Sequence, residues 1–209
     1  SASTEGSPAP GVSSAPGASG PAVPSAVAID VAALQWRQAR PSKVFHPANG
    51  PMASDLAVGA GGRTLLAGLQ MAGGPQKATI WGSDDGRRWS RLKGSMPEGS
   101  QANAIVAMDD GFLIAGSDDR GRALLRRSDG KKVTKIDAPA EALPGGALYD
   151  LARSPAGGLH AAGMDGATPA VWSSTDGGAS WTQASLAGGS RVVDIAVTDT
   201  GTVAALGVV

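Results

Sequence analysis

Residues 172–181 read WSSTDGGASW, and residues 81–89 read WGSDDGRRW. Each stretch places a serine, an aspartate and a glycine between two tryptophans. Residues 125–133, LRRSDGKKV, repeat the frame with leucine and valine at its ends, and the three aspartates are 44 and 47 residues apart. Aspartate accepts hydrogen bonds from the backbone that follows it, and glycine adopts the positive φ of a tight reversal. The frame therefore predicts three strand–turn–strand units.

A second hairpin precedes each of these frames. Gly68, Gly116, Gly163 and Gly207 end similar apolar segments at intervals of 48, 47 and 44 residues. Before each glycine, apolar residues alternate around a GG, DG or TG turn, which is a hairpin signal. Two hairpins per period give four short antiparallel strands, and this is the content of one β-propeller blade. We therefore predict an all-β propeller.

The predicted units cover residues 50–97, 98–142, 143–189 and 190–209, and the last of them holds two strands. Residues 36–39 (WRQA) are similar to residues 181–184 (WTQA), so residues 27–40 are a candidate outer strand for a split fourth blade. The alternative for this segment is a short helix capped by Asp30. Two arrangements fit. One is a closed ring of about four blades, and the other is an incomplete arc of a larger ring, either a fragment of it or a half that a second copy or another polypeptide completes.

The frame at residues 174–181 resembles the Asp-box, or BNR repeat, of sialidase-like β-propellers, whose pattern is S-x-D-x-G-x-x-W. The first two frames are similar but lack one turn residue, and the middle one has Arg127 for serine and Val133 for tryptophan. The resemblance covers about residues 50–209 and implies that the box residues are structural. It also implies that the last tryptophan of each frame wedges between sheets. The box residues are Ser83, Asp85, Gly86, Trp89, Asp129, Gly130, Ser174, Asp176, Gly177 and Trp181.

Composition narrows the function classes. Lysines and arginines number 18 and aspartates and glutamates 18, so no basic field attracts nucleic acid. No apolar run reaches the roughly 20 residues of a membrane helix. The chain has no cysteine, which excludes disulfides and thiolate metal sites. Within residues 1–26, Ser, Ala, Pro and Gly fill 22 positions, which predicts a flexible tether. Such tethers resemble those of secreted or lipid-anchored bacterial surface proteins, so we expect an extracytoplasmic location.

The sialidase resemblance makes a glycoside hydrolase the alternative function. A sialidase uses an arginine triad, a tyrosine paired with a glutamate, and an early F/Y-R-I-P segment, which does not occur here. Tyr149 is the single tyrosine, and the glutamates are Glu5, Glu98 and Glu141. No facing carboxylate pair can be assigned. His46 and His160 lie 114 residues apart, and the DD pairs fall in predicted turns. We therefore assign no catalytic residue, metal or cofactor.

The main hypothesis is a non-catalytic scaffold that binds a protein or glycan partner. In propellers, ligands bind at the loops opposite the box turns. Such loops present functional groups from a rigid frame. In this chain those loops include residues 71–77, 118–122 and 164–169, together with 95–102 and 138–147. The predicted binding residues are Gln70, Gln76, Lys77, Asp118, Arg120, Arg122 and Asp165.

Overall fold

The computed structural model describes residues 43–45, 50–71, 74–94, 96–136, 143, 146–186 and 191–208. The chain divides into two units, residues 1–38 and 39–209, and everything described here belongs to the second. The tether predicted for residues 1–26 and the strand or helix predicted for residues 27–40 lie outside the described residues. In the described part, no helix is long and apolar enough to cross a membrane.

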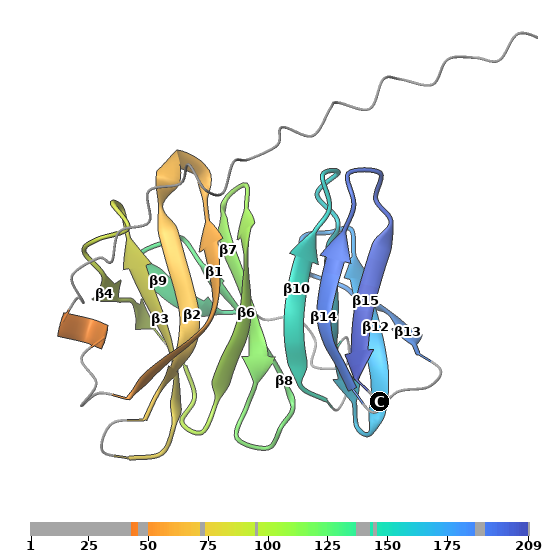
Figure 1. Cartoon of the computed structure of the whole chain (residues 1–209), viewed down its shortest axis with the longest axis horizontal. Helices are drawn as coiled ribbons and strands as arrows, with labels where there is room; N and C mark the ends of the chain where they lie inside the picture. Colours follow the sequence, from red (N-terminus) through yellow and green to blue (C-terminus); the bar gives the residue numbers. More distant parts are fainter. Residues whose placement is uncertain are drawn as a thin grey trace, which may run out of the picture. The chain divides into compact units, whose positions relative to one another are not determined.

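Four successive antiparallel sheets make up this unit, and we call them blades 1 to 4 (Figure 1). Blade 1 contains β1 (Pro51–Val58), β2 (Thr64–Gln70), β3 (Lys77–Ser83) and β4 (Ser90–Arg91). Blade 2 contains β6 (Gln101–Met108), β7 (Gly111–Ser117), β8 (Ala123–Ser128) and β9 (Lys132–Lys135). Blade 3 contains β10 (Leu148–Arg153), β11 (Leu159–Asp165), β12 (Thr168–Ser174) and β13 (Thr182–Ser185). Blade 4 contains β14 (Arg191–Val197) and β15 (Val203–Val208).

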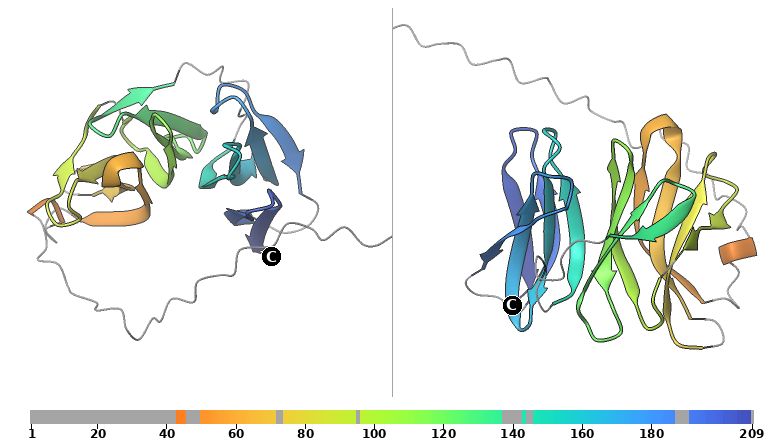
Figure 2. Two further views of the ribbon diagram at one scale, coloured as in Figure 1. Left: turned by 90° about the horizontal axis from the view of Figure 1, so that it is seen from above. Right: turned by 180° about the vertical axis from the view of Figure 1, so that it is seen from behind.

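The predicted fold class is confirmed: the protein is all-β and is built from repeated four-stranded blades, with a partial fourth. The first strands of successive blades are neighbours, since β1 contacts β6, β6 contacts β10 and β10 contacts β14 (Figure 2). One element departs from the pattern. The short strand β5 (Lys93–Gly94) follows blade 1 in sequence but pairs in parallel with β9, so the sheet of blade 2 has five strands.

A bulge recurs at the same place in each first strand, and it explains the glycine repeat. The register shifts in β1 between Ala53 and Asp55, and at matching places in β6, β10 and β14. Gly116 lies opposite the shift in blade 2, and a Cβ on it would overlap the backbone carbonyl oxygen of Gln101. Gly68 and Gly163 are equally crowded. In blades 1 to 3, the repeated glycine therefore lies where the backbones of the first two strands approach closely.

The core lies between blades. One cluster of buried side chains joins blades 1 and 2, a second joins blades 2 and 3, and a third joins blades 3 and 4. Among the described residues, the largest fully buried side chains are those of Trp81 and Trp172, each 1% exposed, on the third strands of blades 1 and 3. Trp89 and Trp181, expected to be the wedges, are half-buried and lie just before β4 and β13. In blades 1 and 3, the first tryptophan of the frame is thus more deeply buried than the last, because the first lies within a strand and the last lies where the turn ends.

Candidate functional site

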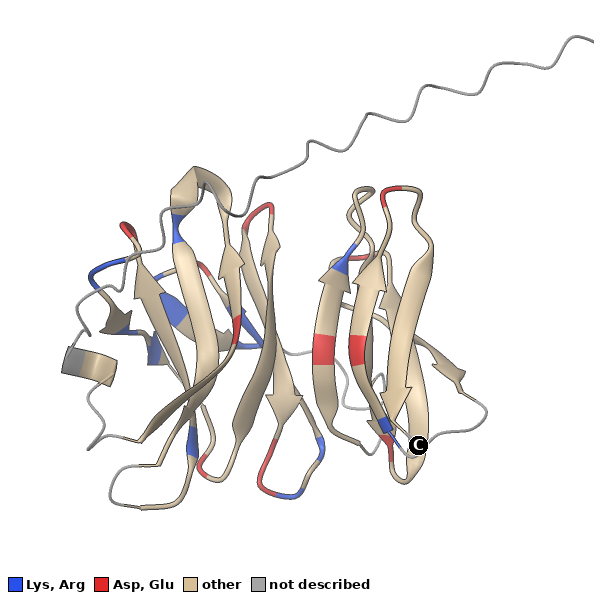
Figure 3. Ribbon diagram, in the orientation of Figure 1, with Lys and Arg blue, Asp and Glu red and all other residues tan. Residues whose placement is uncertain are grey.

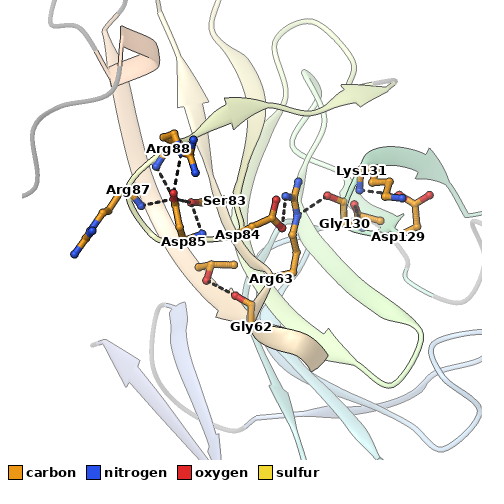
Figure 4. Close-up of polar contacts among 12 residues, drawn as sticks. Gly62, Arg63, Ser83, Asp84, Asp85, Arg87, Arg88, Asp129, Gly130 and Lys131 are labelled. Atoms are coloured by element: carbon orange, nitrogen blue, oxygen red, sulfur yellow. Dashed lines mark hydrogen bonds and ion pairs between the residues drawn. The ribbon is translucent and has the colours of Figure 1, made fainter.

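The aspartate turns are the segments 83–89, 128–133 and 174–181 that link the third and fourth strands of blades 1, 2 and 3. In the first of them, Oδ1 of Asp85 accepts the backbone N–H groups of Arg87 at 2.9 Å and Arg88 at 2.7 Å (Figure 4). The Ser83 hydroxyl donates to the same oxygen, and Gly86 has φ 67°. These donors, led by the Arg88 N–H, hold the pKa of Asp85 well below its usual range.

In the other two turns, different donors also lower the pKa of the aspartate. In the third turn, the Ser180 hydroxyl and N–H both donate to Asp176, and Ser174 donates as well; these bonds lower the pKa of Asp176. In the second turn, Asp129 accepts the N–H groups of the next two lysines, each at 2.9 Å, which likewise lowers its pKa. There Ser128, one position later than the frame predicts, accepts the Gly130 N–H. A serine is thus present in all three turns.

Arginines connect these turns across the blade boundaries. Arg63, in the turn after β1, donates from Nε to the Gly130 carbonyl of blade 2 at 2.9 Å and pairs with Asp84 at 2.7 Å. Arg127 of blade 2 donates from Nη2 to the Gly177 carbonyl of blade 3. Figure 4 shows Arg63 between the two aspartate turns that it joins. The sequence does not indicate these contacts, because the partners of the two arginines are backbone atoms of a different repeat.

A shallow hollow of about 280 Å³ lies beside these arginines, between blades 1 and 2. Three of its charged groups form ion pairs: Asp110 with Arg127, Asp109 with Arg153, and Arg63 with Asp84. The fourth, Asp129, accepts two backbone N–H groups of its own turn. Among the described residues, no group of three or more His, Asp or Glu side chains is placed to hold a metal ion. The geometry at this end serves to hold blades together.

Carboxylates on the first strands form a second structural device. Asp55, next to the bulge in β1, accepts the Leu56 N–H with Oδ1 at 2.7 Å and the Ile105 N–H of blade 2 with Oδ2 at 2.7 Å. Asp150 of blade 3 repeats this with its own next residue and with Ile195 of blade 4, both at 2.8 Å. Blade 2 has Ala104 at this position, and its bulged residue Asn103 instead donates to the Leu148 carbonyl of blade 3.

The acidic positions of β10 and β14 lie side by side (Figure 3). Burial, followed by a hydrogen bond with Asp194, raises the pKa of Asp150 to about 6. The backbone N–H groups of Ile195 and Leu151 lower the pKa of Asp150, and so oppose the effects of burial and of Asp194. The repeated motifs DLAV, DLAR and DIAV, at residues 55–58, 150–153 and 194–197, are the signal in the sequence that could have identified these carboxylates.

Replacing Asp194 with asparagine should flatten the dependence of stability on pH between about 4 and 6. The folded-state pKa of Asp150 lies above its ordinary value of 3.8, so the native state keeps a proton that the unfolded chain has lost in this window. The contribution of Asp150 to the free energy of unfolding therefore falls as the pH rises through this window. The variant removes the neighbouring carboxylate and offers an amide donor, so this decline should be shallower. Urea midpoints measured from pH 4 to pH 7 test this.

Asp199→Asn is the matched control, because Asp199 lies exposed in the turn between β14 and β15. It removes the same formal charge from the same blade without touching Asp150, and it should keep the wild-type slope. Equal slopes in the wild type and Asp194→Asn would refute the coupling between the two carboxyl groups.

The predicted binding residues lie at the other end of the blades from the aspartate turns (Figure 1). Gln70 ends β2, and Gln76 and Lys77 are at the start of β3. The Gln76 carbonyl accepts the Gly99 N–H at 2.9 Å, and Gly99 lies against Asp119. The connection between blades 1 and 2 thus brings the loop before β3 next to the turn 118–122.

Three of the predicted residues are engaged within their own blades. Asp118 pairs with Arg122 at 2.6 Å and also accepts two backbone N–H groups. Burial alone would raise the pKa of Asp118, but the bonds from Arg122 and the backbone outweigh it and lower that pKa. Asp165 accepts a bond from Gln183 of its own blade at 2.9 Å. Among the described residues, the side chains of Gln70, Gln76, Lys77 and Arg120 have no such partner.

The residues considered for catalysis are dispersed. Tyr149 is the bulged residue of β10, and its ring lies 5.5 Å from the Arg191 guanidinium. Glu98 is on the connection that precedes β6, where its backbone bridges to Lys77. His160 shares a 2.9 Å hydrogen bond with the Ser173 hydroxyl, and burial lowers its pKa. His46, Glu5 and Glu141 lie outside the described residues.

No protein-family model and no curated protein sequence matches the chain. Among solved structures, YCF48 from Cyanidioschyzon merolae is similar, with a TM-score of 0.45 and 15% sequence identity. The match covers 70% of this chain and 45% of that one, so the chain spans less than half the length of that structure.

Proposed function

We propose that this chain is a non-catalytic β-propeller of the Asp-box type that acts as an extracytoplasmic binding or assembly scaffold for a protein or glycan partner. The turn geometry supports the Asp-box assignment. In the first two turns the aspartate accepts two successive backbone N–H groups, and in the third it accepts the N–H and the hydroxyl of Ser180. Glycine supplies the positive φ in all three. The resemblance of residues 1–26 to surface-protein tethers supports the location.

The observation that carries the proposal is the unequal use of polar side chains at the two ends of the blades. At the aspartate-turn end, Arg63, Arg127 and Arg153 pair with aspartates, and the first two also donate to backbone carbonyls of the next blade. At the opposite end, Gln70, Gln76, Lys77 and Arg120 form no side-chain hydrogen bond or ion pair with other described residues. Side chains that are not needed for blade packing are the ones available to a ligand.

A glycan array probed with the labelled full chain, together with hydrolysis assays on aryl glycosides that include a sialoside, tests the proposal. We expect binding to a glycan class without turnover. Lys77→Ala combined with Arg120→Ala should weaken that binding at least about tenfold, since a contact at the centre of a binding surface contributes 1 kcal/mol or more.

The matched control is Arg87→Ala combined with Lys131→Ala, which removes the same charges from exposed positions in the aspartate turns. If the control pair weakens binding and the test pair does not, the ligand binds at the aspartate-turn end and the proposed binding surface is wrong. Release of the aryl group by the wild type would replace the scaffold with the glycoside hydrolase alternative. A chain that binds no glycan should then be assayed against protein partners with the same two variants.

A further inference from the structure

The outer strands of blades 1 and 2, with the turns that lead into them, hold an uneven share of the chain's positive charge. Residues 87–93 read RRWSRLK and residues 131–135 read KKVTK, so these two short segments contain seven of the 18 lysines and arginines and no acidic residue. All seven are exposed. Figure 3 shows blue on these outer strands, whereas β13, the outer strand of blade 3, is tan. We call the seven residues the basic rim: Arg87, Arg88, Arg91, Lys93, Lys131, Lys132 and Lys135.

The short strand β5 places two of these cations side by side. It follows blade 1 in sequence but pairs in parallel with β9, and in this pairing Lys93 is the partner of Lys132. Like charges at paired positions of neighbouring strands destabilise a sheet. The adjacent residues Leu92 and Val133 are buried in the cluster that joins blades 1 and 2. Apolar packing thus holds the two segments together and keeps two lysines next to each other at the surface.

Little of this charge is neutralised within the described part of the chain. Arg88 pairs with Asp85 of its own turn at 2.9 Å. After two backbone hydrogen bonds, the charge of Lys132 also lowers the pKa of Asp129, but no ion pair joins these two side chains. Apart from Arg88, the side chains of the basic rim form no hydrogen bond or ion pair with another described residue.

The blade architecture does not require this concentration of charge. β13 has the equivalent position in blade 3, and its residues are TQAS. Lysines protect an exposed strand edge from pairing with a foreign strand, and β5 is the outermost strand of its sheet. That role does not extend to Arg87 and Lys131, because they lie in the aspartate turns and belong to no strand.

The other side chains of the basic rim narrow the kind of ligand. Ser90 and Thr134 are exposed hydroxyls, and the exposed large hydrophobic side chains of the described residues lie on other elements, so the rim has no apolar anchor for a bilayer. The Trp89 indole donates to the Gly86 carbonyl and its ring packs on Phe45, which leaves it poorly placed to stack on nucleic acid bases. Cations and hydroxyls are the groups that a hydrated anionic polymer needs.

We propose that the basic rim binds an extended anionic polysaccharide, whose sulfate, phosphate or carboxylate groups lie between the lysines and arginines of blades 1 and 2. The complementary charge supplies the attraction. A bound anion also relieves the repulsion between Lys93 and Lys132. The basic rim does not include the loop residues proposed above to bind a partner. Uncharged glycans report on those loops alone, so the failure of one proposal leaves the other standing.

Dextran sulfate and uncharged dextran of the same chain length test this proposal, because they differ only in the anionic groups. In titrations with the full chain at low ionic strength, we expect binding to dextran sulfate that weakens as salt is added, and none to dextran. Lys93→Glu should raise the dissociation constant for dextran sulfate at least about tenfold, since it replaces an attractive charge with a repulsive one. Lys135→Glu, at the end of β9, should weaken binding in the same way and provides a second variant if the first does not fold.

Arg191→Glu is the matched control, because Arg191 is exposed on blade 4 and the substitution changes the net charge by the same amount. It should bind dextran sulfate as the wild type does. The thermal midpoint of Lys93→Glu separates binding from packing. The new carboxylate lies beside Lys132, so the midpoint should be no lower than that of the wild type although binding is weaker.

Three results would overturn the proposal. Equal losses of affinity in Lys93→Glu and Arg191→Glu would mean that the polymer responds to net charge alone. Tighter binding to phosphatidylglycerol vesicles or to oligothymidylate than to dextran sulfate would make the ligand a bilayer or a nucleic acid. No binding to dextran sulfate at low ionic strength would leave protection of a strand edge as the role of these lysines.

Discussion

Trp172→Ala should lower the free energy of unfolding by about 3–5 kcal/mol, the usual cost of deleting a fully buried aromatic side chain. Trp172 is 1% exposed and packs with Leu113 and Leu125 of blade 2, so the substitution leaves a cavity at the boundary of two blades. Its indole N–H also donates to Gln183 of β13 at 3.2 Å. The loss can be measured as the shift in the urea midpoint at constant slope.

Trp181→Ala tests the expectation, implied by the family resemblance, that the last tryptophan of the frame is the one that wedges between sheets. Trp181 is half-buried, and its indole donates to the Gly178 carbonyl at 3.1 Å within the same turn. Its removal should cost about 1–2 kcal/mol, because less apolar surface leaves water on folding. A larger effect for Trp181 than for Trp172 would show that the last tryptophan of the frame is the main wedge after all.

Gly116→Ala is expected to have the next largest effect, a loss of about 1–3 kcal/mol from overpacking. The new methyl group would overlap the Gln101 carbonyl oxygen across the bulge, so the two strands must separate. Gly207→Ala is the matched control, because the nearest atom to a Cβ there is the Arg191 carbonyl oxygen at 3.4 Å. Thermal unfolding of the two variants should place Gly116→Ala well below the wild type and Gly207→Ala close to it. Equal losses would mean that backbone entropy, rather than the close approach, selects glycine.

Much of the fold could be predicted from local chemistry. The aspartate turns and the glycine repeat are signals that a short stretch of chain carries by itself, and they fixed the number and order of strands in each blade. The period then indicated repeated sheets. The frame of the second turn has Arg127 where the pattern has serine, so no serine was predicted there, and the structure shows that the neighbouring Ser128 supplies the hydroxyl.

The parts that could not be predicted depend on contacts between repeats. Nothing in the sequence around Arg63 indicates that its partner is the carbonyl of Gly130 in another blade. In the same way, the paired carboxyls of Asp150 and Asp194 come together only when β10 and β14 lie side by side. The residues predicted to bind a partner lie in loops opposite the aspartate turns, but the engagement of Asp118 by Arg122 depends on a turn conformation that residue type alone does not specify.

The short strand β5 has a consequence for how molecules of this kind avoid aggregation. The outermost strand of a sheet exposes unpaired N–H and C=O groups that can recruit a strand from a foreign chain. In the sheet of blade 2 the outermost strand is β5, which has two residues and pairs with Lys132 and Val133 of β9. The lysines at positions 131, 132 and 135 further discourage strand addition there, since burying them against another chain is unfavourable. The rim of blade 2 thus offers a foreign strand only a short edge.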